Sequence, residues 1–351
     1  MKKFSCDCGN RLFFHNNHCL ACLREVSWCP VCNTLTAFEV SESGLSCARC
    51  KSSLWKCANR INYEVCNRSV LAPETPSGEL LCDCCVYNKT IPDLGEPGNL
   101  ERWRELEKAK RQLFYGLNSL GLPHCSGISD DAHGLSFHFK DDETSPKAFW
   151  RSIGKKERVF TGHDNGKITI HVREADTVTR EKLRVDLGEG HRTLIGHFRH
   201  EIGHYYWDLL IGPNEEMLRG FVGLFGDHNA DYAEALDRYY KEGASANWQN
   251  GFISAYATMH PWEDWAETFA FYLNVVDVME TVNCSELIQM PVPGDFKGLI
   301  DLYARFGILM NELNRAMGLI DFLPAVIPPT VLDKLEFVHA VVEKASSTNG
   351  A

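Results

Sequence analysis

The central stretch of the chain reads His197-Phe198-Arg199-His200-Glu201-Ile202-Gly203-His204-Tyr205-Tyr206-Trp207. It contains the pattern H-E-x-x-H, in which His200 and His204 stand at positions i and i+4. On a helix these positions lie on one face, one turn apart, so two imidazoles can bind one metal ion. Glu201 would lie beside the ion, where its carboxylate can accept a proton from an activated water. The stretch therefore predicts a metal site with a general base.

The surrounding residues predict the helix that this pattern needs. Between Thr193 and Leu210, apolar residues recur at helical spacing, and Gly212-Pro213 ends the segment. Gly203 is the weak position, because glycine costs about 1 kcal/mol in a helix interior. Its small size predicts that another element approaches closely there. The alternative is an ordinary amphipathic helix whose histidines belong to the polar face.

A third ligand is expected because catalytic zinc has three protein ligands and one open position. Pro261 suits the first turn of a helix, and Glu263 and Glu267 then share one face. We predict that Glu263 is the oxygen ligand and that Glu267 accepts a hydrogen bond from a ligating imidazole. The alternative is a solvated acidic face. Asp227 and His228 are rival ligands. The stretch that carries this prediction reads His260-Pro261-Trp262-Glu263-Asp264-Trp265-Ala266-Glu267-Thr268-Phe269-Ala270.

The first 85 residues hold 13 of the 15 cysteines, several of them as C-x-x-C, and no export signal precedes them. This pattern is typical of zinc sites in a reducing, cytoplasmic setting. Two quartets predict two structural zinc sites, with metal binding supplying much of the folding free energy. A cross-braced arrangement, with alternate pairs sharing metals, is the alternative. The quartets are Cys29, Cys32, Cys47 and Cys50, which form a regular zinc ribbon, and Cys6, Cys8, Cys19 and Cys22, which are less regular.

H-E-x-x-H followed well downstream by a helical E-x-x-A-E resembles the gluzincin metallopeptidases. The resemblance implies that His200, His204 and Glu263 hold zinc, with Glu201 as the general base. Some gluzincins place a tyrosine two turns before the third ligand to stabilise the oxyanion, which makes Tyr256 a candidate for that role.

The chain also resembles, over nearly its whole length, one bacterial family of zinc-binding metallopeptidases with N-terminal zinc ribbons, a family named from its motif. Besides the cysteine-rich start, the resemblance rests on His191 through Trp207, Phe225-Gly226-Asp227 through Asp231-Tyr232, Thr90 through Leu94 and His260 through Asp264.

This resemblance favours a third zinc site in residues 54–93. Its ligands would be Cys57, Cys66, Cys82 and Cys85, although Cys84 leaves that choice open. The alternative is a set of free buried thiols. Residues 1 to 90 hold 10 Lys and Arg against 8 Asp and Glu, a balance of only +2. The thiolates of each zinc site would cancel that balance, so a protein-docking or substrate-presenting module is favoured over a nucleic-acid patch.

Composition limits the remaining possibilities. The chain has 351 residues and a net charge of −11, which argues against general nucleic-acid binding. No apolar run approaches 18 residues, so we expect no membrane span, and the first residues do not read as a signal peptide. We predict tandem zinc ribbons at 1–53, a third zinc module and linker at 54–93, a zincin-like domain at 94–345 and a disordered tail at 346–351.

The predicted fold class is α+β: a mainly helical zincin-like metallopeptidase domain with a small mixed sheet, preceded by small zinc-ribbon modules. A strand at 135–139 and a hairpin around Asp164-Asn165-Gly166 would supply the sheet. We predict a zinc-dependent hydrolase with one catalytic and two to three structural zinc ions, acting on peptides or proteins. The alternatives are a non-catalytic interaction protein, a nucleic-acid binder, and a hydrolase for a non-peptide amide.

Overall fold

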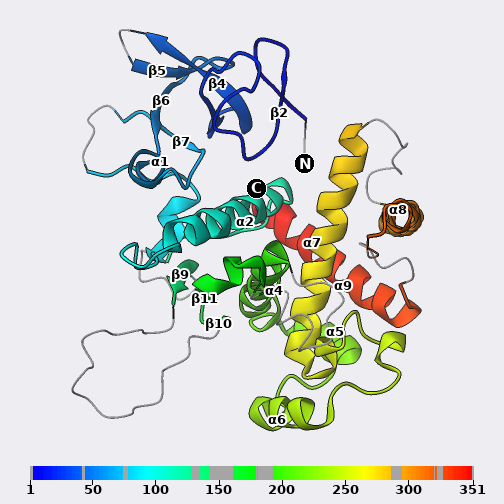
Figure 1. Ribbon diagram of the computed structural model, residues 1–351. Helices are drawn as coiled ribbons and strands as arrows, with labels where there is room; N and C mark the ends of the chain where they lie inside the picture. Colours follow the sequence, from blue (N-terminus) through cyan, green and yellow to red (C-terminus); the bar gives the residue numbers. More distant parts are fainter. Residues whose placement is uncertain are drawn as a thin grey trace, which may run out of the picture. The chain divides into compact units, whose positions relative to one another are not determined.

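The computed structural model describes residues 3–41, 44–73, 78–127, 134–141, 161–178, 180, 193–285, 295–319, 321 and 327–349 (Figure 1). The chain divides into two compact units. The first unit comprises Met1–Gln112 and Cys125–Thr179, and the second comprises Leu113–His124 and Arg180–Ala351. Helix α2 (Asn99–Ser119) contributes residues to both. The cysteine quartets fall in the first unit, and the H-E-x-x-H helix falls in the second.

An antiparallel sheet forms the body of the cysteine-rich region, after a hairpin of β1 (Phe4–Ser5) and β2 (Arg11–Leu12). The sheet continues past residue 53, where we expected one module to end. Leu54 packs in one core with Cys29, Phe38 and Cys47, because a short ribbon has too few apolar side chains for a core of its own. The strands lie in chain order: β3 (Val26–Cys29), β4 (Thr34–Ser41), β5 (Gly44–Cys47), β6 (Ser53–Lys56) and β7 (Ser69–Leu71).

A four-stranded mixed sheet completes the first unit. The antiparallel β10–β11 hairpin confirms the turn prediction, since Asn165 and Gly166 both have positive φ, 48° and 79°. Residues 159 and 160, which we also assigned to a strand, lie outside the described residues. The ammonium of Lys110 on α2 lies over the rings of Phe137 and Phe139 in β9. The strand order is β10 (Gly162–Asp164), β11 (Lys167–His171), β9 (Ser136–Lys140) and β8 (Asn88–Thr90).

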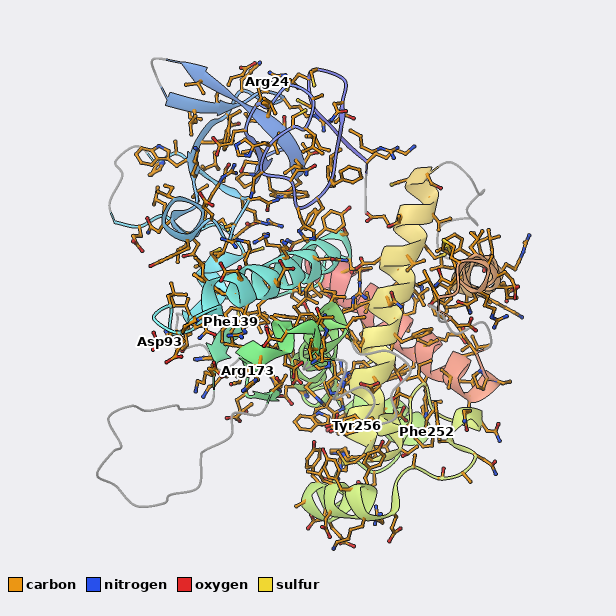
Figure 2. All side chains as sticks on the ribbon, in the orientation of Figure 1. Arg24, Asp93, Phe139, Arg173, Phe252 and Tyr256 are labelled. Atoms are coloured by element: carbon orange, nitrogen blue, oxygen red, sulfur yellow. The ribbon has the colours of Figure 1, made fainter. Side chains whose placement is uncertain are left out.

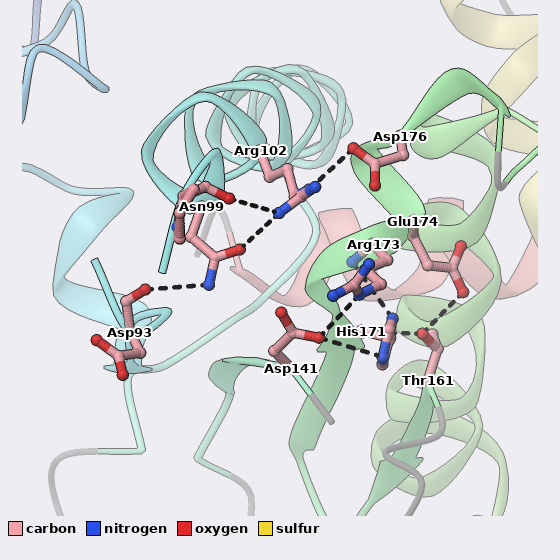
Figure 3. A network of polar contacts seen from close by, with 10 residues as sticks. Asp93, Asn99, Arg102, Asp141, Thr161, His171, Arg173, Glu174 and Asp176 are labelled. Carbon is pink, nitrogen blue, oxygen red and sulfur yellow. Dashed lines mark hydrogen bonds and ion pairs between the residues drawn. The ribbon is translucent and has the colours of Figure 1, made fainter. Parts of the chain in front are cut away.

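Polar contacts hold the ends of these strands (Figure 3). The carboxylate of Asp141, just after β9, accepts a hydrogen bond from Arg173 at 3.2 Å, and Arg102 on α2 donates to Asp176 at 2.9 Å. Backbone N–H of Arg173 donates to His171 Nδ1, which caps the short 3₁₀ helix η3 (Val172–Ala175). His163 Nε2 accepts from the N–H of Gly166 inside the hairpin. Both histidines therefore have structural contacts.

Helices make up the described part of the second unit. Together with the sheets of the first unit, they confirm the predicted α+β class. In the described part of the chain, no helix is long and apolar enough to cross a membrane. The helices are α4 (Leu194–Tyr206), which continues as one π-helical turn (Trp207–Ile211), α5 (Glu215–Phe225), α6 (Tyr232–Glu242), α7 (Pro261–Ser285), α8 (Phe296–Ala316) and α9 (Pro329–Asn349).

Helices α4 and α7 pack closely against each other (Figure 1). Gly203 is the contact point: a Cβ at this position would lie 3.0 Å from the Cα of Ala266 and 3.3 Å from its carbonyl oxygen. The indole of Trp265 donates a hydrogen bond to the carbonyl of Gly203 at 2.8 Å. Phe198 and Phe269 are fully buried beside this contact. The close approach predicted from Gly203 is therefore present.

The C-terminal helix α9 supports the start of α7. The buried ammonium of Lys334 donates to the carboxylate of Asp264 at 2.6 Å and to the carbonyl of Gly251 at 2.7 Å. It also lies 4.3 Å from the ring centroid of Phe252. Our expectation of a disordered tail from residue 346 is wrong for residues 346–349. They continue α9, where the hydroxyl of Ser346 hydrogen-bonds the carbonyl of Leu120.

Replacing Gly203 by alanine tests the contact between α4 and α7. Helix propensity alone would stabilise the variant by about 1 kcal/mol. Overpacking against backbone atoms costs about 1–3 kcal/mol, so we expect Gly203→Ala to lower the melting temperature. Gly223→Ala in α5 is the matched control, because its Cβ would meet no atom within 4 Å. Calorimetry should show a higher melting temperature for this control. A Gly203→Ala protein as stable as its Gly223→Ala counterpart would contradict the close contact.

Candidate metal centres

Three ligand atoms converge where α4 faces the first turn of α7. His200 and His204 lie one turn apart on α4, and their Nε2 atoms are 3.2 Å apart. Oε2 of Glu263 lies 2.9 Å from Nε2 of His200 and 3.5 Å from Nε2 of His204. The structure thus brings together the three residues that the sequence predicted as the ligands of one metal ion.

The separations of these atoms fit a zinc ion. Four ligands arranged tetrahedrally at about 2.0–2.1 Å from zinc are roughly 3.3 Å from one another. The three observed distances of 3.2, 2.9 and 3.5 Å lie close to that value. Two neutral imidazole nitrogens and one carboxylate oxygen are also the donor types that catalytic zinc sites use. The residues present therefore fit this ion.

The pKa values of Glu201 and Glu263 are shifted in opposite directions. Glu201 is 7% exposed, and burial raises the pKa of its carboxyl above the usual range, although the imidazoles of His200 and His204 oppose the shift. Burial acts on Glu263 in the same way. There the charges of His204 and His200 and their hydrogen bonds prevail and hold the pKa of Glu263 well below its usual range. Glu201 is thus suited to exchange a proton, and Glu263 to remain a carboxylate ligand.

Glu267 lies where the sequence placed it, one turn after Glu263. Its Oε1 atom is 2.6 Å from Nδ1 of His200. A hydrogen bond at Nδ1 fixes the tautomer in which Nε2 carries the free lone pair, and it orients the ring. That lone pair faces Glu263 and His204. Glu267 therefore holds the first imidazole in the orientation that metal binding needs.

Tyr256 lies near the three ligands, on a short 3₁₀ helix η6 (Tyr256–Thr258) before α7 (Figure 2). Its ring centroid is 6.1 Å from that of His200. The sequence reasoning missed Tyr232, the first residue of α6, whose hydroxyl donates to Oε1 of Glu263 at 2.8 Å. The only sequence signal was its place within one of the stretches that carry the family resemblance.

The rival ligands do not join this cluster. Oδ1 of Asp227 accepts a hydrogen bond from the backbone N–H of Asn229 at 2.9 Å. The ring of His228 packs at 5.4 Å from that of Trp207. Within the described residues, neither side chain belongs to a group of three or more potential metal ligands.

Twelve of the cysteines form three separate quartets, and each quartet consists of the residues that we had grouped. The cross-braced alternative is therefore wrong. Thiolates at about 2.3 Å from a tetrahedral zinc are roughly 3.8 Å apart. The observed Sγ–Sγ distances are 3.6 or 3.7 Å, which fits zinc. The measured pairs are Cys6–Cys22, Cys8–Cys19, Cys29–Cys50, Cys32–Cys47 and Cys66–Cys82.

The third quartet (Cys57, Cys66, Cys82 and Cys85) is fully buried among four cations (Arg60, Arg68, Lys110 and Arg111). Each of the three arginines has a buried nitrogen without a hydrogen-bond partner among the described residues. Such donors are costly unless a negative charge faces them. Zinc bound by four thiolates carries a charge of about −2, which meets this requirement. Cys84 is also buried but lies outside the quartet.

Known families match both regions. Residues 99–341 match a family described as "Putative zinc-binding metallo-peptidase", and residues 3–96 match a zinc-ribbon domain family. Uncharacterized proteins of Mycobacterium tuberculosis and Mycobacterium bovis are each 38% identical over 357 aligned residues. These alignments cover 99% of this chain and 96% of each relative. No solved structure matches.

Removing the Glu267 carboxylate should weaken metal binding at the histidines. Loss of a group that orients a ligating imidazole costs roughly 10- to 100-fold in metal affinity. We expect this loss in Glu267→Ala when zinc is titrated against a competing chelator. Glu343→Ala is the control, because it removes a carboxylate that lies 3.3 Å from His339 on the exposed surface of α9. Equal zinc affinity in the two variants would show that Glu267 does not position His200.

Adjacent cysteines test the third quartet. Cys85→Ala removes one of four converging thiols, so we expect one zinc per chain fewer and a lower melting temperature. Cys84→Ala removes a buried thiol outside the quartet and should retain the full zinc content. Elemental analysis of both purified proteins, against the unmodified chain, measures the difference. Zinc loss in Cys84→Ala with none in Cys85→Ala would show that Cys84, and not Cys85, is the fourth ligand.

Proposed function

Because the chain belongs to this family of zinc-binding metallopeptidases, we propose that it is a zinc-dependent hydrolase that cleaves peptide bonds. The supporting observation is the convergence of His200, His204 and Glu263 at separations that fit zinc, with Glu201 beside them. These three residues would hold the catalytic ion. The spacing of the ligands along the chain corresponds to the gluzincin type.

The bound ion would supply Lewis acidity, which polarises the scissile carbonyl and lowers the pKa of a water molecule. Glu201 accepts a proton from the water as the water oxygen attacks the carbonyl carbon. The same carboxyl then donates this proton to the amide nitrogen as the C–N bond breaks. Burial of Glu201 favours the first step, because it makes the carboxylate a stronger base than an exposed glutamate.

Tyr256 is the proposed donor to the oxygen on which negative charge develops. Its ring lies beside that of His200, and burial raises the pKa of its phenol, so the hydroxyl keeps its proton. A neutral phenol can donate a hydrogen bond to an oxyanion.

The N-terminal quartets would hold two to three structural zinc ions and take no part in the chemistry. We propose that this region docks a protein partner or presents a substrate. Leu20 and Leu23, which flank Cys22 in the first quartet, are 72% and 75% exposed, and Val40 is 81% exposed. Apolar side chains on a nearly uncharged module favour a protein partner over nucleic acid. The cluster of reduced thiols fits a cytoplasmic location.

A second proposal shares this geometry: a metal-stabilised interaction protein whose central site is not catalytic. The exposed apolar side chains of the ribbons also support it. It differs from the first proposal in one requirement only, the proton transfer by Glu201.

Glu201→Gln separates the two proposals. The amide cannot accept the proton, so we expect zinc content equal to that of the unmodified protein and loss of peptide cleavage. His200→Ala combined with Glu263→Ala should lose one zinc per chain while the ribbon zinc remains. Elemental analysis and the release of new N-termini from a peptide library measure these effects. Undiminished cleavage by Glu201→Gln would rule out the proposed mechanism, and unchanged zinc in the double variant would rule out the metal site.

A further inference from the structure

The two carboxylate oxygens of Glu263 have different surroundings. Oε2 faces both imidazoles, at 2.9 Å from His200 and 3.5 Å from His204. Oε1 accepts a hydrogen bond from the hydroxyl of Tyr232 at 2.8 Å. The side chain of Glu263 is only 3% exposed, so bulk water has little access to replace that donor. The orientation of this carboxylate therefore depends on Tyr232.

Neighbouring residues hold the phenol of Tyr232 in place. Its ring lies against that of His260 at 5.3 Å and near that of Trp262 at 6.3 Å. His260 is itself fixed at both nitrogens: Nδ1 accepts from the N–H of Trp262, and Nε2 donates to the carbonyl of Ala230, each at 3.1 Å. Tyr232 is thus positioned by His260 and Trp262, and Trp262 directly precedes Glu263 in sequence.

A carboxylate can bind a metal through one oxygen or through both. If Glu263 used both oxygens, the second would add a fifth bond beside the water and would crowd the position that catalytic zinc keeps open for water or substrate. The hydrogen bond from Tyr232 occupies Oε1, while Oε2 faces the imidazoles.

We propose that Tyr232 is a positioning residue that restricts Glu263 to binding zinc through Oε2 alone and so keeps the fourth position open. This inference rests on the proposed function, since it requires zinc on His200, His204 and Glu263. It also assigns separate roles to the two tyrosines: Tyr232 acts on the metal ligand, whereas Tyr256 lies beside His200.

Tyr232→Phe tests this role, because phenylalanine keeps the ring contacts and removes only the hydroxyl. Tyr240→Phe is the matched control on the same helix, since Tyr240 is 65% exposed. We expect the site in Tyr232→Phe to bind zinc roughly 10- to 100-fold more weakly than in the unmodified protein, as for other groups that orient a metal ligand. One zinc per chain should therefore pass more readily to a competing chelator. The ribbon zinc ions of the same molecules provide an internal reference for intact folding.

Cobalt(II) loaded into the exchangeable site gives a readout that a purely structural role would not change. Four-coordinate cobalt absorbs visible light more strongly than five-coordinate cobalt. The band should therefore weaken in Tyr232→Phe, where Glu263 is free to bind through both oxygens, and stay unchanged in Tyr240→Phe. Wild-type zinc affinity together with a wild-type cobalt spectrum in Tyr232→Phe would overturn the proposal. Absence of an exchangeable zinc in the unmodified protein would instead reject the proposed function itself.

Discussion

The close approach of α4 to α7 is the constraint on which the candidate active site depends. Two imidazoles on one helix and a carboxylate on another meet here at about 3 Å, across two backbones that nearly touch. Gly203 makes this possible because it has no side chain between the helices. The hydrogen bond from Trp265 to its carbonyl then fixes the register of the two helices. A residue that is unfavourable for helix formation thus allows the close contact between the two helices that carry the ligands.

Local spacing along the sequence was enough to predict the central cluster. The four-residue interval from His200 to His204, and the same interval from Glu263 to Glu267, each determine which side chains share a helix face. The structure pairs these two faces as expected. Tyr232 could not be predicted in this way, because it reaches Glu263 from a third helix, and a tyrosine at the start of a helix carries no signal of its own.

The boundaries of the cysteine-rich modules also could not be predicted from local sequence patterns. Cysteine spacing grouped the first two quartets, and the family resemblance favoured the third, as the structure has them, but neither gave information about which strands share a core. Leu54 belongs to the core of the preceding ribbon, although it lies after the last cysteine of that ribbon. The four cations around the third quartet are similarly dispersed in sequence, between Arg60 and Arg111, and only the folded chain brings them to the same thiolates.

The contact that Lys334 makes with Asp264 and Gly251 has a consequence for biosynthesis. Lys334 lies 70 positions after Asp264, so a ribosome completes α7 well before it supplies the ammonium group that anchors the first turn of α7. Domains fold progressively as the chain emerges, and the cysteine quartets therefore have all their ligands first. The candidate site on α4 and α7 gains this support only when α9 has left the ribosome. The helical turn that carries Glu263 is therefore anchored later than any of the three cysteine quartets is complete.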